Sequence, residues 1–183
     1  MDMVVGSNET QQKRNRWPAW LTVLLLVFIL AAGTTLRVIG MDWDEGQHLH
    51  PDERFMTMVI TSIQPVKLSQ YFDAATSTMN PHNVGFGYYV YGTLPLIITR
   101  FIAQSFNMIG YGNVYMVGRY LSALMDLLTV VLVFLAGSRL FKNEKIGLLG
   151  AAFAALSVLP IQLSHYFTVD TFIRNLFGIY KNT

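Results

Sequence analysis

The sequence predicts an all-α, multi-pass membrane protein with three transmembrane helices and amphipathic juxtamembrane helices in a long external first loop. Of its 183 residues, 52% are hydrophobic and only 13% are charged, and the mean hydropathy is +0.39. An ordinary soluble domain has about a quarter of its residues charged. The apolar residues also gather in runs of about 20, which is the length needed to cross the hydrocarbon core of a bilayer.

The same composition excludes several classes of protein. The absence of cysteine excludes a disulfide-stapled scaffold and a zinc–cysteine module. The high apolar content excludes intrinsic disorder. The formal net charge of +2 is too small, and the runs of Lys and Arg are too short, for a nucleic-acid surface. We therefore expect membrane lipid, and no nucleic acid, among the partners.

The first apolar run, residues 17–39, is predicted to be a retained transmembrane helix behind a cytoplasmic tail of residues 1–16. A secretory signal has an apolar region of about 7–15 residues that ends in small residues. This run instead continues without a charge from Trp17 to Leu36. Basic residues precede the run and acidic residues follow it, so the positive-inside rule places the N-terminus in the cytoplasm.

The other predicted spans follow an external loop of residues 40–113. Two further transmembrane helices are expected over 118–138 and 146–164. A basic connector, residues 139–145, joins them and is expected on the cytoplasmic side. Residues 165–183 then form an external end that lacks the apolar length for another span.

Residues 87–109 leave the topology open. The segment is apolar, but Pro95 and Arg100 fall in its middle. If it lies in the membrane interface, the basic connector is cytoplasmic and Asp170 is external, in accord with the positive-inside rule. We favour this interpretation. If the segment crosses the membrane, the chain has four spans and Asp170 faces the cytoplasm.

Acidic residues are concentrated in the external loop where a helix is predicted over residues 51–64. Five of the 11 acidic residues fall between positions 42 and 53. Proline is favoured in the first helical position, so Pro51 places Asp52 and Glu53 in the first turn, where the helix dipole favours their ionised forms. Such a carboxylate accepts a proton from an alcohol or binds a cation, whereas the structural alternative is that it caps the helix.

Nearby imidazoles raise the question of a metal. His48, His50 and Asp44 are weak candidates for a zinc or manganese site, because imidazole and carboxylate together suit these ions. A His-x-His pair in a loop is more often a pair of solvated side chains. A divalent metal therefore stays an open requirement.

Two more carboxylates lie at or within the predicted spans. Asp170 follows the last span and either marks the membrane boundary or faces the acidic loop. Asp126 lies inside an apolar span, where an ionisable side chain usually faces the interior of a helix bundle. Arg119, seven residues earlier on the same helix face, is one partner for it.

Five segments, in this order, carry a resemblance to a known family. They are the span ending in Leu36-Arg37, the loop 50–55 (His-Pro-Asp-Glu-Arg-Phe), and the segments 87–96, 118–126 and 162–171. This set resembles the start of bacterial membrane glycosyltransferases of the type C fold. These family 39-like enzymes are relatives of the dolichyl-phosphate-mannose protein mannosyltransferases and the lipid-A aminoarabinose transferases. The resemblance covers roughly residues 17–172.

The resemblance implies an enzyme of the plasma (inner) membrane that transfers a sugar from a polyprenyl-phosphate-linked donor to a protein, glycan or lipid acceptor on the external face. It assigns Asp52 as the base that deprotonates the acceptor, with Glu53 beside it and Asp170 as the acidic residue of the second external loop. The candidate substrate-binding residues are Arg37, Arg54, Arg119 and His165.

Two further expectations concern the extent of the chain and the alternatives to an enzyme. Members of the family are several times longer, so we expect an N-terminal fragment or a truncated product that is inactive alone. The alternative is a small non-catalytic membrane protein that binds a lipid carrier or partner helices, because small residues along 147–155 allow a helix to approach closely. A transporter or channel subunit would need polar residues in several spans, and only Asp126 qualifies.

Overall fold

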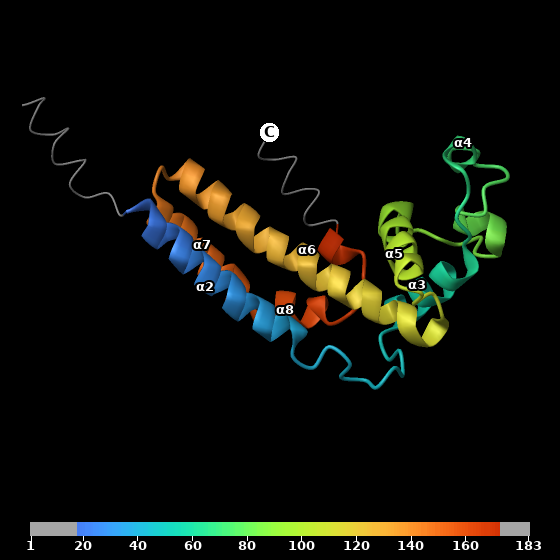
Figure 1. The fold of residues 1–183 in the computed structure, drawn as a ribbon, viewed down its shortest axis with the longest axis horizontal. Helices are drawn as coiled ribbons and strands as arrows, with labels where there is room; N and C mark the ends of the chain where they lie inside the picture. Colours follow the sequence, from blue (N-terminus) through green and yellow to red (C-terminus); the bar gives the residue numbers. More distant parts are fainter. Residues whose placement is uncertain (1–17, 173–183) are drawn as a thin grey trace, which may run out of the picture.

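The computed structural model describes residues 18–172, and this part of the chain is entirely helical and irregular structure, without a strand. Figure 1 shows an elongated bundle of long helices with a lobe of shorter helices at one end. The all-helical class predicted from the sequence is therefore confirmed. The bundle contains α2 (Ala19–Val38), α6 (Tyr111–Leu140), α7 (Glu144–Leu156) and α8 (Val158–Ser164), and the lobe contains α3 (Pro51–Ser62), α4 (Leu68–Tyr71), the 3₁₀ helix η1 (Pro81–Val84) and α5 (Thr93–Ser105).

The bundle has the length and the surface of a membrane protein. Two helices, α2 and α6, are long and apolar enough to cross a bilayer, and the bent pair α7 and α8 makes a third if it counts as one span. Large apolar side chains on the outside of these helices have no protein cover, and Phe28 and Phe153 are 70% and 69% exposed. Such faces suit contact with lipid rather than with water.

A break divides the third apolar helix. α7 ends at Leu156, α8 begins at Val158, and the two axes differ by 56°. Ser157 between them has an extended backbone, with φ −66° and ψ 126°. Pro160 follows within the next turn and has no amide hydrogen to donate to Leu156, so a continuous helix is disfavoured here.

Small residues along α7 pack against helices of the same chain. A Cβ atom built on Gly147 would overlap the side chain of Ser138 on α6, and one built on Gly150 would lie 3.2 Å from Val133 Cγ1. On the other side, an added Cβ on Gly33 of α2 would lie 3.4 Å from Ala155 Cβ. The chain's own helices therefore occupy much of the face that the sequence offered to a partner helix.

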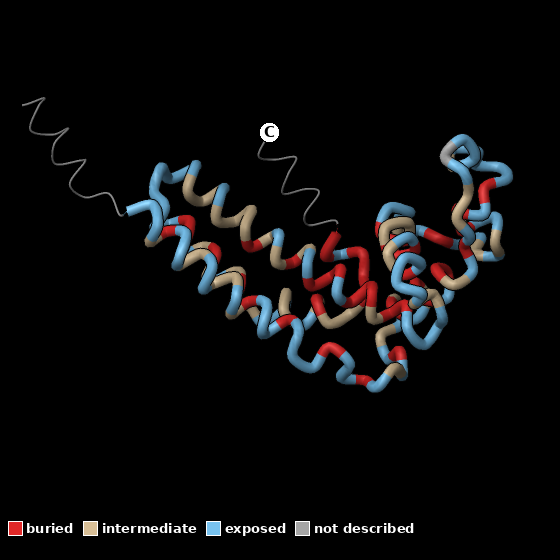
Figure 2. The backbone as a smooth tube through the Cα atoms, in the orientation of Figure 1, coloured by how far each residue is buried: buried red, intermediate tan, exposed pale blue. Residues whose placement is uncertain are grey.

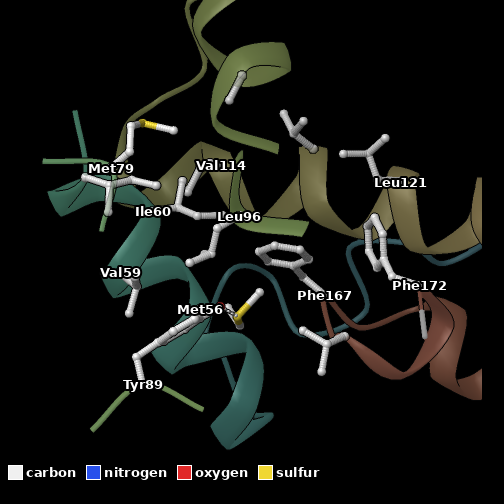
Figure 3. Close-up of a cluster of buried hydrophobic side chains, with 14 residues drawn as sticks. Met56, Val59, Ile60, Met79, Tyr89, Leu96, Val114, Leu121, Phe167 and Phe172 are labelled. Atoms are coloured by element: carbon white, nitrogen blue, oxygen red, sulfur yellow. Dashed lines mark hydrogen bonds between the residues drawn. The ribbon is translucent and has the colours of Figure 1, made fainter. Parts of the chain in front are cut away.

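The hydrophobic core lies where the lobe meets the first half of α6. Met56 and Ile60 of α3, Leu96 of α5, Val114 of α6 and Phe167 are all fully buried. Figure 3 shows these side chains directed toward one another, and Figure 2 shows that buried residues are concentrated in this region. The segment after α8 is thereby packed against the lobe although it follows α3 by more than 100 residues.

The helix bounds differ from the expected ones at their ends. The helix expected from Pro51 is α3, and it ends at Ser62 just before Pro65. α6 begins at Tyr111 rather than 118, and Tyr115 in its second turn donates to Asp42 Oδ1 at 2.9 Å in the loop before α3. Within 87–109, only Thr93–Ser105 is an α-helix. α5 is not among the candidate spans.

Candidate functional site

Arg119 of α6 donates hydrogen bonds to the acidic loop and to the first turn of α3. Its Nε donates to Glu53 Oε2 at 2.8 Å, and its Nη2 donates to Glu53 Oε1 at 2.6 Å and to Asp44 Oδ1 at 2.9 Å. Its Nη1 donates to the Met41 carbonyl at 2.7 Å. Both Arg119 and Glu53 are 0% exposed. Arg119 therefore ties the loop and the start of α3 to α6 through buried, charge-assisted hydrogen bonds.

Glu53 also holds the segment after α8. The Phe167 amide donates to Glu53 Oε2 at 2.8 Å. A Cβ atom on Gly118 would overlap the Phe167 ring, so the absence of a side chain there lets this segment lie close to α6. One carboxylate thus joins α3, α6 and the chain that leads to Asp170. Both oxygens of Glu53 therefore accept hydrogen bonds from groups of the protein itself.

Asp44 is the second buried carboxylate on Arg119. Burial alone would raise the pKa of Asp44, but the hydrogen bond from Arg119 and the amides of Leu49 and Gly46 hold it below the usual 3.8. Asp44 is therefore ionised in the folded protein at neutral pH. Its charge is used by Arg119 and by the loop backbone.

Asp52 is the accessible member of the Asp-Glu pair. It lies in the first turn of α3 and is partly exposed. The Tyr91 hydroxyl donates to Asp52 Oδ1 at 2.9 Å. Successive helical residues point about 100° apart, so Glu53 turns into the protein while Asp52 turns to its surface.

Tyr91 is held in place by the turn before α5. The Tyr89 hydroxyl donates to the Gly92 carbonyl at 2.8 Å, and Gly92 has φ +81°, a conformation that favours glycine. The Tyr91 ring lies 5.9 Å from the rings of Phe55 and Tyr89. These contacts orient the phenol toward Asp52.

The charge of Asp170 has a smaller effect on Tyr91 than Asp52 has. The hydrogen bond to Asp52 contributes most to raising the pKa of the Tyr91 phenol above its usual 10.0, followed by burial, the charge of Asp52, Tyr88 and the charge of Asp170. Asp170 is exposed. Asp52 therefore contacts the phenol directly, whereas Asp170, 118 positions later in the sequence, contributes the smallest of these effects through its charge.

Arg37 and Asp126 form a separate buried ion pair in the bundle. Arg37 Nη2 lies 2.6 Å from Asp126 Oδ2, and the two side chains are 0% and 2% exposed. The sequence offered Arg119 as the partner of Asp126. The structure instead pairs Asp126 with Arg37 of α2, and Arg119 with Glu53 of α3 and with Asp44 of the loop before it.

The four candidate substrate-binding residues lie in different surroundings. Arg37 and Arg119 are fully buried, with their guanidinium groups occupied by carboxylates and carbonyls. Arg54 is exposed, and its Nε donates to the His48 carbonyl at 3.2 Å. His165 is partly buried, and its Nε2 lies 2.9 Å from the Ile39 carbonyl oxygen. Arg54 is therefore the arginine of this set that faces the surface.

The candidate metal ligands do not come together. His48 is 4% exposed and its ring lies 4.5 Å from Tyr111 and 4.7 Å from Tyr115, with both nitrogens unpaired. The His50 ring lies 4.5 Å from the Tyr166 ring and is tilted by 38° to it. In residues 18–172, no group of three or more His, Asp or Glu side chains is placed to hold a metal ion. Asp44, the third candidate, is bound by Arg119.

Comparison with known proteins gives no family: no family model matches the chain, and no curated protein or solved structure matches it. The chemistry of the site is therefore inferred from its own side chains. These are an accessible carboxylate held by a phenol, a second carboxylate near the same phenol, and an exposed arginine two residues from the first carboxylate.

Proposed function

We propose that this chain is the N-terminal, site-bearing part of a membrane glycosyltransferase that uses a polyprenyl-phosphate-linked sugar. The observation that carries the proposal is that Asp52 and Glu53, although adjacent in the sequence, have different surroundings. Glu53 is buried by Arg119 and the Phe167 amide, while Asp52 is accessible and oriented by Tyr91. An oriented surface carboxylate beside a membrane is the group that an alcohol acceptor needs as a general base.

The proposed topology has three spans, with the bent pair α7 and α8 as the third. The end of α2 and the start of α6 meet at the lobe, since Arg119 donates to the Met41 carbonyl. At the other end of the bundle, Thr22 near the start of α2 donates to Glu144 at the start of α7 at 2.6 Å. This arrangement supports placing the basic connector with the cytoplasmic N-terminus and the carboxylate site outside, with α5 at the membrane surface.

In the proposed reaction, Asp52 removes the proton of an acceptor hydroxyl while that oxygen forms a bond to C1 of the sugar. The bond between C1 and the phosphate oxygen of the donor breaks, and the lipid phosphate leaves with the electron pair. Tyr91 occupies Asp52 Oδ1 and leaves Oδ2 to receive the proton. Arg54 is the surface cation available to stabilise the negative charge of the departing phosphate.

A lipid-linked donor fits the proposed location. A nucleotide sugar is made in the cytoplasm and does not reach an external site directly, whereas a polyprenyl carrier presents its sugar at the membrane surface. The exposed apolar faces of α2 and α7 suit contact with the lipid that would hold such a carrier.

The donor class is tested with the complete gene product reconstituted in vesicles. The vesicles receive either a labelled polyprenyl-phosphate sugar or the matching labelled nucleotide sugar, with the same acceptor extract. We expect label transfer from the lipid-linked donor and none from the nucleotide sugar. Transfer from the nucleotide sugar alone would contradict the proposal, and tight binding of the lipid carrier without turnover would favour a non-catalytic carrier-binding protein.

A further inference from the structure

The break between α7 and α8 leaves the backbone carbonyls of Ala154 and Ala155 without their helical partners, in addition to the Leu156 carbonyl, to which Pro160 cannot donate. In a continuous helix, the amides of residues 158 and 159 would donate to the carbonyls of Ala154 and Ala155. The extended backbone at Ser157 removes both of these hydrogen bonds. Inside a membrane no water replaces them, so an unsatisfied carbonyl there destabilises the fold.

Arg37 of α2 satisfies the carbonyls of Ala154 and Ala155. Its Nη1 donates to the Ala155 carbonyl at 2.9 Å, and its Nη2 lies 3.4 Å from the Ala154 carbonyl. Its Nη1 also donates to the Gly33 carbonyl, and its Nε donates to Asp126 Oδ2 at 2.7 Å. One buried guanidinium therefore caps the end of α7 while Asp126 balances its charge.

We propose that Arg37 is a positioning residue that holds the third apolar helix broken and thereby places the segment carrying Asp170 against the acidic loop. The break turns the chain by 56°, and α8 then leads into the segment that reaches the lobe. Ile39 lies two residues after Arg37, and its carbonyl oxygen is 2.9 Å from His165 Nε2 in the segment after α8. Phe167 lies three residues before Asp170, and its amide donates to Glu53 Oε2.

The effect of Arg37 on catalysis rests on the proposed function, but its effect on the break does not. A simpler role is that Arg37 only neutralises Asp126. The two roles predict different results in a protein with Asp126→Asn. If Arg37 only neutralises Asp126, Arg37 can then be replaced without effect. If Arg37 binds the carbonyls of Ala154 and Ala155, replacing it still disturbs the break.

Because the chain has no cysteine, introduced pairs report single contacts without background. The pair Gly118→Cys and Phe167→Cys reports the position of the segment after α8, since a Cβ atom on Gly118 would lie within the Phe167 ring. The control pair Val133→Cys and Gly150→Cys reports the packing of α7 on α6 ahead of the break, where the built Cβ lies 3.2 Å from Val133 Cγ1.

Each cysteine pair is introduced into the complete protein in vesicles, and disulfide yield is measured after mild oxidation by gel mobility. The backgrounds are wild type, Asp126→Asn, and the double variant Arg37→Met with Asp126→Asn. We expect the 118–167 disulfide to form equally in wild type and Asp126→Asn, and to fall at least about fivefold in the double variant. The 133–150 disulfide should form equally in all three.

Adding Pro160→Ala to the double variant gives a second check. The new amide lets α7 and α8 join into one helix, so the 118–167 disulfide should stay low, and a return of this disulfide to the wild-type yield would contradict the proposal.

Full 118–167 yield in the double variant overturns the proposal. Equal loss of both disulfides also overturns it, because Arg37 would then support the whole bundle. A loss of the 118–167 disulfide in Asp126→Asn but not in the double variant would also contradict the proposal, because Arg37 and Asp126 would then only balance each other's charge. None of these measurements uses a donor sugar, so their outcome is separate from that of the transferase proposal.

Discussion

Arg119 on α6 binds both oxygens of Glu53 on α3, with Nε 2.8 Å from Oε2 and Nη2 2.6 Å from Oε1. This buried pair fixes the rotation of α3 about its axis. Asp52, one residue earlier, then faces outward to Tyr91. Two neighbouring carboxylates therefore have different positions, and the buried one sets the orientation of the accessible one.

Glu53→Gln is expected to destabilise the fold. Loss of the charge leaves Arg119 buried with a weaker partner, and breaking a buried ion pair from one side costs about 3 kcal/mol. Glu45→Gln, an exposed carboxylate of the same loop, is the matched control and should change stability by less than about 0.5 kcal/mol. Thermal unfolding in detergent compares the two variants, and equal losses would argue against the structural position of Glu53.

Gly118→Ala should disturb the contact between α6 and the segment after α8. The new methyl group would overlap the Phe167 ring, and overpacking of a core costs about 1–3 kcal/mol. Gly112→Ala in the same helix has open space around the added Cβ, so it should be neutral or stabilising by up to about 1 kcal/mol. Denaturant midpoints of both variants test this. A neutral Gly118→Ala would mean that Phe167 lies elsewhere.

Asp44 should make stability fall in acid. Its folded-state pKa lies below the usual 3.8, so the ionised carboxylate stabilises the fold at pH values above 3.8 and this stability is lost as the pH falls through the folded-state pKa. In Asp44→Asn the melting temperature should be lower at neutral pH and should change less between pH 4 and pH 2. An equally steep acid loss in wild type and variant would assign the dependence to other groups.

Tyr91→Phe should slow transfer without weakening substrate binding. The phenol has a raised pKa because it donates to Asp52, so it stays protonated and oriented at neutral pH. A hydrogen bond to a charged group contributes about 1.5 kcal/mol, which corresponds to roughly a tenfold loss in kcat. Tyr88→Phe, at an 84% exposed neighbour, is the control. A change in KM alone, with kcat intact, would place Tyr91 in substrate binding instead.

The sequence predicts much of the secondary structure because that information is local. Pro51 marks the start of α3, and the uncharged run after Trp17 marks α2. The partners of the buried arginines could not be predicted in the same way. Helical spacing relates Arg119 to Asp126 on one helix, but their actual partners lie on other helices and depend on how these pack.

The contact of Tyr91 with Asp52 could not be predicted from the sequence for the same reason. Tyr91 lies in the segment 87–96, which the resemblance to glycosyltransferases includes, but 39 positions separate it from Asp52. No periodic pattern spans such a distance. The signal available in the sequence was a cluster of tyrosines next to glycines, and this predicts a turn without naming the carboxylate that a phenol meets.

The most direct measurement of the central claim is the transfer rate of Asp52→Asn in the complete protein, with a polyprenyl-phosphate sugar as donor. Asp73→Asn is the control, because Asp73 is an exposed carboxylate of the same lobe that accepts hydrogen bonds within its own turn. An amide cannot take the proton of the acceptor, so Asp52→Asn should reduce kcat at least about 100-fold while Asp73→Asn keeps the wild-type rate. A wild-type rate in Asp52→Asn would contradict the assignment of Asp52 as the base.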